Sequence, residues 1–150
     1  MVAQKLGRTF LDFDAEIERR EGMPIAQIFG ERGEAGFRQL EHKLTEELKD
    51  LGNMVLSPGG GWVADPSNVA VLRPPAMFVY LRVRPDTALK RLAGVAGGRP
   101  LLNHPDPLGE LTKLYEARRA AYQSSDIEIG TEILTPQQVT DQIVAKVAGK

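Results

Sequence analysis

The segment Thr9-Phe-Leu-Asp-Phe-Asp-Ala-Glu-Ile-Glu-Arg-Arg20 joins a short apolar strand to a charged helix. Residues 9–12 have the length and apolar character of a buried strand, and residues 15–20 follow Asp14, a residue type that caps helices. Asp12 and Asp14 therefore lie where a strand ends. In open α/β sheets, ligands bind beyond the carboxyl ends of the strands.

The rest of the chain continues this alternation of strands and helices. We expect three more strands, at residues 53–57, 76–83 and 126–129. One helix is expected to begin with its first turn at Pro24, and another at about residue 34. Three more are expected at 85–92, 108–123 and 136–147. The helix from residue 34 carries an apolar stripe of Phe37, Leu40, Leu44, Leu48 and Leu51. This order predicts a three-layer α/β/α domain with a mainly parallel sheet.

Composition restricts the class of protein. The chain has 150 residues, which suits one domain over residues 1–150, and 19 basic against 20 acidic side chains give a net charge of −1. That balance offers no basic excess for nucleic acid or an anionic membrane surface. No apolar run reaches the length of a membrane span, and there is no cysteine for a disulfide or a thiolate metal site. We therefore expect a cytoplasmic protein.

The two aspartates allow two interpretations. As a functional pair, they can hold a magnesium-bound water and accept a proton from a substrate hydroxyl. As structural residues, Asp14 caps the helix and Asp12 is a solvated strand end. Arg38 also allows two interpretations. It can bind a ligand carboxylate bidentately, or form helix ion pairs with Glu34 and Glu41.

Two glycine-rich segments fit no regular element. Three consecutive glycines, Gly59, Gly60 and Gly61, follow a predicted strand and allow close approach of a ligand to the backbone, although a wide turn would also use glycine. Residues 94–107 form the longest irregular segment, which we interpret as a lid. Arg99 in this lid and Arg118 in the next helix can neutralise phosphate or carboxylate, or be ordinary exposed arginines.

Six motifs in this order resemble the shikimate kinase family, whose members are P-loop kinases with a nucleoside monophosphate kinase-like fold. The resemblance extends from about residue 3 to the last helix. It rests on the motifs Phe10-Leu-Asp-Phe-Asp14 with Ile17-Glu18, Gly22-Met-Pro-Ile-Ala-Gln-Ile-Phe29, Gly33-Glu-Ala-Gly-Phe-Arg-Gln-Leu-Glu41, Gly59-Gly-Gly61, Arg99-Pro-Leu-Leu102 and Arg118-x-x-x-Tyr122.

The resemblance implies ATP-dependent phosphorylation of the shikimate 3-hydroxyl, on the route to chorismate and the aromatic amino acids. Asp14 would orient that hydroxyl, and Asp12 would contact Mg²⁺ through water. Arg38 and Arg118 would hold the substrate carboxylate, while the backbone of the glycine run would meet the ring hydroxyls. Arg99 would close over the nucleotide phosphates. The family also implies a monomer that binds a small molecule, without nucleic acid or membrane.

One part of the family pattern does not occur in the 150 residues. Family members begin with a strand and a Gly-x-x-Gly-x-Gly-Lys-Ser/Thr loop, and here residues 2–8 look like the tail of the helix that follows this loop. We therefore expect the central first strand of the family order 2-3-1-4-5 to be missing. Either a slot remains at that position, or the strands at 53–57 and 76–83 pair directly.

Three hypotheses account for this departure. The chain is a shikimate kinase that has lost its amino-terminal segment, a P-loop-less relative that binds a small carboxylate as a sensor or scaffold, or another small-molecule kinase such as a gluconate kinase. Asp14, Arg38, the glycine run, Arg99 and Arg118 favour the first hypothesis over the third. They do not separate the first from the second.

Overall fold

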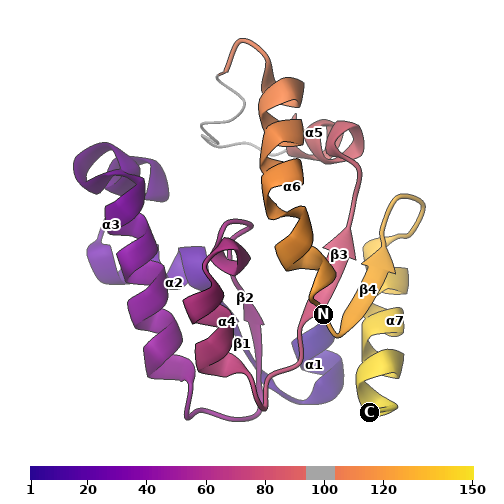
Figure 1. Ribbon diagram of the computed structural model, residues 1–150. Helices are drawn as coiled ribbons and strands as arrows, with labels where there is room; N and C mark the ends of the chain where they lie inside the picture. Colours follow the sequence, from indigo (N-terminus) through magenta and orange to yellow (C-terminus); the bar gives the residue numbers. More distant parts are fainter. Residues whose placement is uncertain (94–103) are drawn as a thin grey trace. The chain divides into compact units, whose positions relative to one another are not determined.

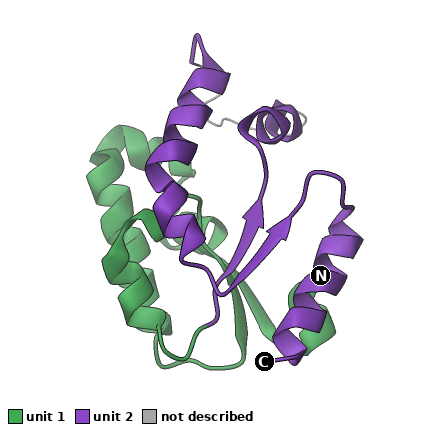
Figure 2. Ribbon diagram, turned by 45° about the vertical axis from the view of Figure 1, so that its right-hand side comes forward, with its two compact units in different colours: residues 1–76 green, residues 77–150 purple. Residues whose placement is uncertain are grey.

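The computed structural model describes residues 1–93 and 104–150 (Figure 1). By its internal contacts, the chain divides into a first unit, Met1–Ala76, and a second unit, Met77–Lys150 (Figure 2). Each unit contains a pair of parallel strands and the helices that pack beside them. The predicted lid at 94–107 falls mostly on residues 94–103, which lie outside the described residues, as does Arg99.

The first unit is built on two of the predicted strands. Its elements are α1 (Val2–Leu6), β1 (Thr9–Asp12), α2 (Phe13–Glu21), α3 (Ile25–Leu48), β2 (Met54–Ser57), a 3-10 turn η1 (Trp62–Ala64) and α4 (Pro66–Leu72). Strands β1 and β2 pair in parallel, with Asp12 opposite Ser57. Because their carboxyl ends share one edge, the residues that follow them, Asp14 and Gly59, emerge on the same side.

The first turn of α2 corrects one sequence prediction. The helix begins at Phe13, and its N-cap is Asp12 rather than Asp14. The Oδ1 atom of Asp12 accepts the backbone N–H groups of Asp14 and Ala15 at 3.0 and 3.3 Å. An N-cap carboxylate satisfies helix donors that have no partner within the helix. The side chain of Asp14 is therefore not needed as the cap.

Helix α3 is divided by a single glycine. Gly33 has φ 68° and ψ 179°, a conformation that side chains other than hydrogen strongly disfavour. The segment after this break packs Phe37, Leu44 and Leu48 into the core. The predicted apolar stripe was one residue too long at its end, because the helix stops at Leu48 and Leu51 lies beyond it, 58% exposed.

The second unit confirms the remaining predicted elements with small changes. It comprises β3 (Val79–Arg82), α5 (Pro85–Ala93), α6 (Pro107–Gln123), β4 (Ile127–Gly130) and α7 (Pro136–Ala148). Strand β3 is shorter than the predicted 76–83, because its parallel partner β4 offers four residues, from Val79 opposite Ile127 to Arg82 opposite Gly130. Strand β4 itself begins one residue later than predicted.

Strand pairing tests the expectation of a missing central strand. In residues 1–93 and 104–150, the sheets are β1–β2 and β3–β4, and no pairing joins β2 to β3. Direct pairing of these two strands, one of the two expected arrangements, is therefore wrong for this part of the chain. No helix in the described ranges is long and apolar enough to span a membrane.

Candidate functional site

Acidic groups from two helices meet at the glycine run of the first unit. A Cβ atom at Gly59 would lie 3.5 Å from Oδ1 of Asp14 and 3.6 Å from Oε2 of Glu41. Asp14 comes from the first turn of α2, and Glu41 comes from α3, where its side chain is fully buried. Gly59 thus leaves space in front of both carboxylates, at the edge where β1 and β2 end.

Arg38 lies against the same run of glycines. Its Nη1 atom is 2.5 Å from Oε1 of Glu41, its Nη2 atom is 3.4 Å from Oε1 of Glu34, and its guanidinium also contacts the ring of Phe37. Both ion pairs considered from the sequence are therefore present. A Cβ atom at Gly61 would come within 2.6 Å of the Arg38 Cζ atom. The guanidinium covers the Gly61 backbone, so these groups occupy one site.

Glu41 is a site residue that the sequence interpretation had placed only as a helix partner of Arg38. Its carboxylate is buried, and a buried charge needs a paired and hydrogen-bonded partner. Arg38 supplies that partner while 28% of its own side chain stays exposed. Glu41 lies four residues after Phe37 and three before Leu44, so it falls on the buried side of α3. This spacing was the signal available in the sequence.

Asp12 can contribute to a metal site through its second oxygen. Oδ1 is used by the α2 cap, and within the described residues no hydrogen bond engages Oδ2. No group of three or more potential metal ligands occurs in the described parts of the chain. Magnesium typically keeps several waters and binds one or two carboxylates together with substrate phosphates. A water-mediated contact from Asp12 fits this behaviour, whereas a cage of protein ligands does not.

Arg118 is placed in the second unit, on α6. It makes no hydrogen bond or ion pair with any residue in the ranges 1–93 and 104–150, whereas Arg119 beside it lies 3.9 Å from Glu116. Arg118 lines a cavity of about 150 Å³ formed by β3, α5 and α6. There Tyr80 stacks on Tyr122 with ring centroids 4.8 Å apart, and burial raises the pKa of Tyr80 to about 12. A half-buried guanidinium that pairs with no anion among the described residues is suited to a ligand anion.

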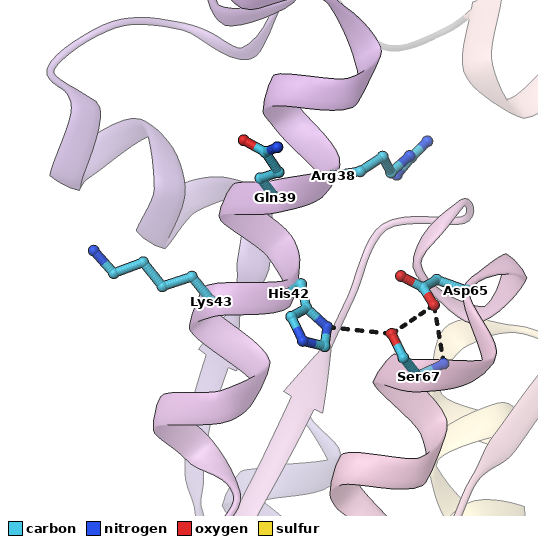
Figure 3. A pocket seen from close by; sticks show the side chains of 6 residues that line it. All are labelled: Arg38, Gln39, His42, Lys43, Asp65 and Ser67. Atoms are coloured by element: carbon cyan, nitrogen blue, oxygen red, sulfur yellow. Dashed lines mark hydrogen bonds between the residues drawn. The ribbon is translucent and has the colours of Figure 1, made fainter.

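A larger hollow of about 330 Å³ lies between α3 and α4 (Figure 3). Arg38 is the one predicted site residue that lines it. Arg38 and Lys43 point to opposite sides of α3, so their charges do not converge. Asp65 caps α4, and hydrogen bonds from the Ser67 hydroxyl and backbone N–H hold the pKa of Asp65 below its usual value. The predicted site groups Asp14, Arg38 and Gly59–Gly61 therefore gather at the edge at Gly59 and not in this hollow.

The family model for shikimate kinase matches residues 1–148 of the chain. The chain belongs to the shikimate kinase family. A shikimate kinase from Caldicellulosiruptor bescii is 37% identical over 145 residues, covering 97% of this chain and 84% of that protein. One from Persephonella marina is 36% identical over 147 residues, covering 98% of this chain and 88% of that protein.

Solved shikimate kinases share the fold. The structure from Acinetobacter baumannii in complex with shikimate has a TM-score of 0.91 and 32% identity, covering 99% of this chain and 83% of that chain. The structure from Aquifex aeolicus has a TM-score of 0.79 and 30% identity, covering 99% of this chain and 86% of that chain. The fold class predicted from the sequence, a nucleoside monophosphate kinase-like α/β fold with parallel strands, is confirmed. Shikimate kinases use ATP as the phosphate donor, so the enzyme class is a phosphotransferase.

Replacing Gly61 with alanine tests the contact with Arg38. Gly61 has φ −86°, which alanine tolerates, so the backbone is not strained. The new methyl group instead pushes the guanidinium away from Glu41. We expect Gly61→Ala to weaken shikimate binding about tenfold while the thermal midpoint changes little, measured by calorimetry and thermal unfolding.

Gly52→Ala is the matched control for this substitution. A Cβ atom at Gly52 meets no atom within 4 Å, and its φ is not in the left-handed region. Its shikimate affinity should equal that of the parent. Equal affinities for Gly61→Ala and the parent would show that the Arg38 position above Gly61 does not matter for binding.

Proposed function

We propose that the first unit holds shikimate for phosphorylation of its 3-hydroxyl by ATP, with the carboxylate on Arg38 and the ring hydroxyls at Asp14 and the Gly59–Gly61 backbone. The observation that carries this proposal is the meeting of Asp14, Glu41 and Arg38 around the glycine run. A small anion with several hydroxyls needs a guanidinium, a carboxylate and bare backbone. All three lie at this edge.

Arg38 has donors to spare for a substrate carboxylate. A guanidinium carries five N–H donors in a planar fork, and Glu41 engages the Nη1 end at 2.5 Å. The second partner, Glu34, is 70% exposed and 3.4 Å away, so it is weakly held and readily displaced. Glu41 fixes the guanidinium orientation, and the remaining fork then meets the substrate carboxylate.

Asp14 serves as the acceptor for the proton of the 3-hydroxyl. Its carboxylate lies beside Gly59, where no side chain separates it from a ligand on the backbone. General base catalysis requires the base within hydrogen-bond reach of the proton that it removes. Asp12, held by the α2 cap, would contact a magnesium-bound water through Oδ2. The metal ion, when bound with ATP, neutralises charge on the phosphates.

Arg118 and Arg99 complete the set of residues proposed to contact the substrate and the phosphates. The family resemblance assigns Arg118 a second contact to the substrate carboxylate. Arg99, which lies outside the described residues, meets the phosphoryl group during transfer. Both assignments follow the family motifs Arg118-x-x-x-Tyr122 and Arg99-Pro-Leu-Leu102. Arg118 gains support from its lack of a protein partner in the described ranges.

The 150-residue polypeptide should bind shikimate weakly and transfer no phosphate. The proposed substrate groups are present, but its sequence contains no Gly-x-x-Gly-x-Gly-Lys-Ser/Thr loop to cradle the β- and γ-phosphates. Calorimetry with shikimate measures the first expectation, and an assay with ATP and Mg²⁺ measures the second. Arg38→Ala provides the binding-deficient control. Robust phosphorylation by this polypeptide, or no difference between parent and Arg38→Ala in binding, would contradict the proposal.

A further inference from the structure

Trp62 connects the three parts of the proposed shikimate site. It directly follows Gly61 and is 2% exposed. Its ring meets the ring of Phe13 edge-on, with centroids 6.2 Å apart and an interplanar angle of 76°. Phe13 is the residue between Asp12 and Asp14. One tryptophan therefore adjoins the glycine run in the chain and packs on the residue between the two aspartates.

Thr45 links the same indole to Arg38. The Nε1–H group of Trp62 donates to Oγ1 of Thr45 at 2.8 Å, and this hydroxyl donates its own hydrogen to the Glu41 backbone carbonyl at 2.8 Å. Thr45 is fully buried. A hydroxyl has one hydrogen, so these two bonds fix its direction. Thr45 thus connects Trp62 to the turn of α3 that carries Glu41, the partner of Arg38.

The backbone of Trp62 is held as firmly as its side chain. Its N–H donates to the Gly59 carbonyl at 3.1 Å, and its carbonyl accepts Nδ2 of the buried Asn68 at 3.1 Å. Because that amide nitrogen faces a carbonyl, the Oδ1 atom of Asn68 faces His42, which donates from Nδ1 at 2.8 Å. Trp62 is anchored through both its backbone and its side chain in a buried network whose donors and acceptors are mutually consistent.

We infer that Trp62 and Thr45 are positioning residues that set the spacing between Asp14, the Arg38–Glu41 pair and the Gly59–Gly61 backbone. This inference rests on the proposed function of the first unit. Neither side chain touches the ligand in this arrangement. Their effect is to hold three separate segments, α2, α3 and the glycine run, at the separation that a single small ring requires. Loss of the Trp62–Thr45 bond loosens that spacing and weakens substrate binding.

Thr45→Val tests this role with nearly the same side-chain shape. The valine leaves the Trp62 N–H without its acceptor, and we expect shikimate binding to weaken about three- to tenfold. Thr45→Ser keeps the hydroxyl and should bind like the parent. Calorimetry gives the dissociation constants. Trp62→Phe removes the donor but keeps an aromatic ring, and it provides the same comparison if Thr45→Val does not fold.

Thr140→Val is the matched control for a purely structural effect. Thr140 is buried on α7 in the second unit, and its Oγ1 atom donates to the Pro136 carbonyl at 2.8 Å, as Thr45 does to Glu41. It has no indole donor in the described structure. We expect Thr140→Val to lower the thermal midpoint without changing the dissociation constant for shikimate. Equal weakening by Thr140→Val and Thr45→Val would overturn the inference.

Fluorescence provides a second readout, because Trp62 is the single tryptophan in the sequence. Shikimate should change the emission of the parent and of Thr45→Ser, and should change that of Thr45→Val at higher ligand concentration. If the parent binds shikimate and Thr45→Val binds with the same constant, the positioning role is wrong and the proposed function stands. If the parent does not bind shikimate at all, the proposed function fails and the inference fails with it.

Discussion

Asp14→Asn should lower the turnover number on the order of 10³-fold, with a much smaller change in KM. An amide has nearly the size of a carboxylate, so the space at Gly59 is preserved, but an amide is a poor acceptor for the hydroxyl proton. The measurement is steady-state kinetics on a chimera that joins this chain behind the strand and Gly-Lys-Ser/Thr loop of a family member.

Asp65→Asn is the matched control for this substitution. Asp65 caps α4 through the Ser67 N–H group, and asparagine is an equally good N-cap. It lies in the same unit but outside the proposed site, so its turnover should equal that of the parent chimera. A turnover number for Asp14→Asn within twofold of the parent would contradict the role of Asp14 as proton acceptor.

Arg99→Ala should also reduce turnover, by about 10³-fold on the precedent of arginine fingers. Arg99 is proposed to contact the charge that develops during phosphoryl transfer. Its removal therefore raises the energy of the transition state more than that of the bound substrate. Arg118→Ala provides the contrast. The substrate carboxylate does not change in the reaction, so losing a contact to it removes uniform binding and mainly raises KM for shikimate.

In the same chimera, Arg99→Ala should therefore lower the turnover number, whereas Arg118→Ala should raise KM. Arg38→Ala should resemble Arg118→Ala, with a raised KM, after circular dichroism shows that each variant is folded. If Arg99→Ala turned over like the parent chimera, the proposed lid role would be wrong. If Arg118→Ala lowered turnover with unchanged KM, Arg118 would act on the transferred group and not on the carboxylate.

Local patterns in the sequence predicted most of the elements but not their ends. Strand β1 was predicted to the residue, because an apolar run ends at a helix cap. Strand β3 was predicted too long, because the length of a parallel ladder is set by the partner, and β4 has four residues. The α2 cap was assigned to Asp14 because both aspartates suit a cap, and the choice of Asp12 depends on backbone geometry.

The residues proposed to bind the ligand directly were predictable from the sequence, and most of those that act on one another were not. Asp14, Arg38 and the glycine run were identified from motifs, and the structure brings them together. The buried partner Glu41 and the network through Trp62, Thr45 and Asn68 were missed as site features, as was helix α4. The Trp62–Thr45 and His42–Asn68 bonds join α3 to residues 17 and 26 positions later, which no local pattern encodes, whereas the Arg38–Glu41 pair spans three residues.

The break at Gly33 makes α3 two helical segments that pack on each other, since the ring centroids of Phe29 and Phe37 lie 4.7 Å apart. Residues 25–32 end in a conformation that is essentially restricted to glycine, and the register of Arg38, Glu41 and Thr45 begins anew after it. A change at Phe29 is therefore transmitted to Phe37, whose ring also contacts the Arg38 guanidinium. In an engineered sequence, residues 25–32 can therefore be redesigned only together with the Phe37 contact, and only if Gly33 is retained, because another residue would have to adopt φ 68° and ψ 179°.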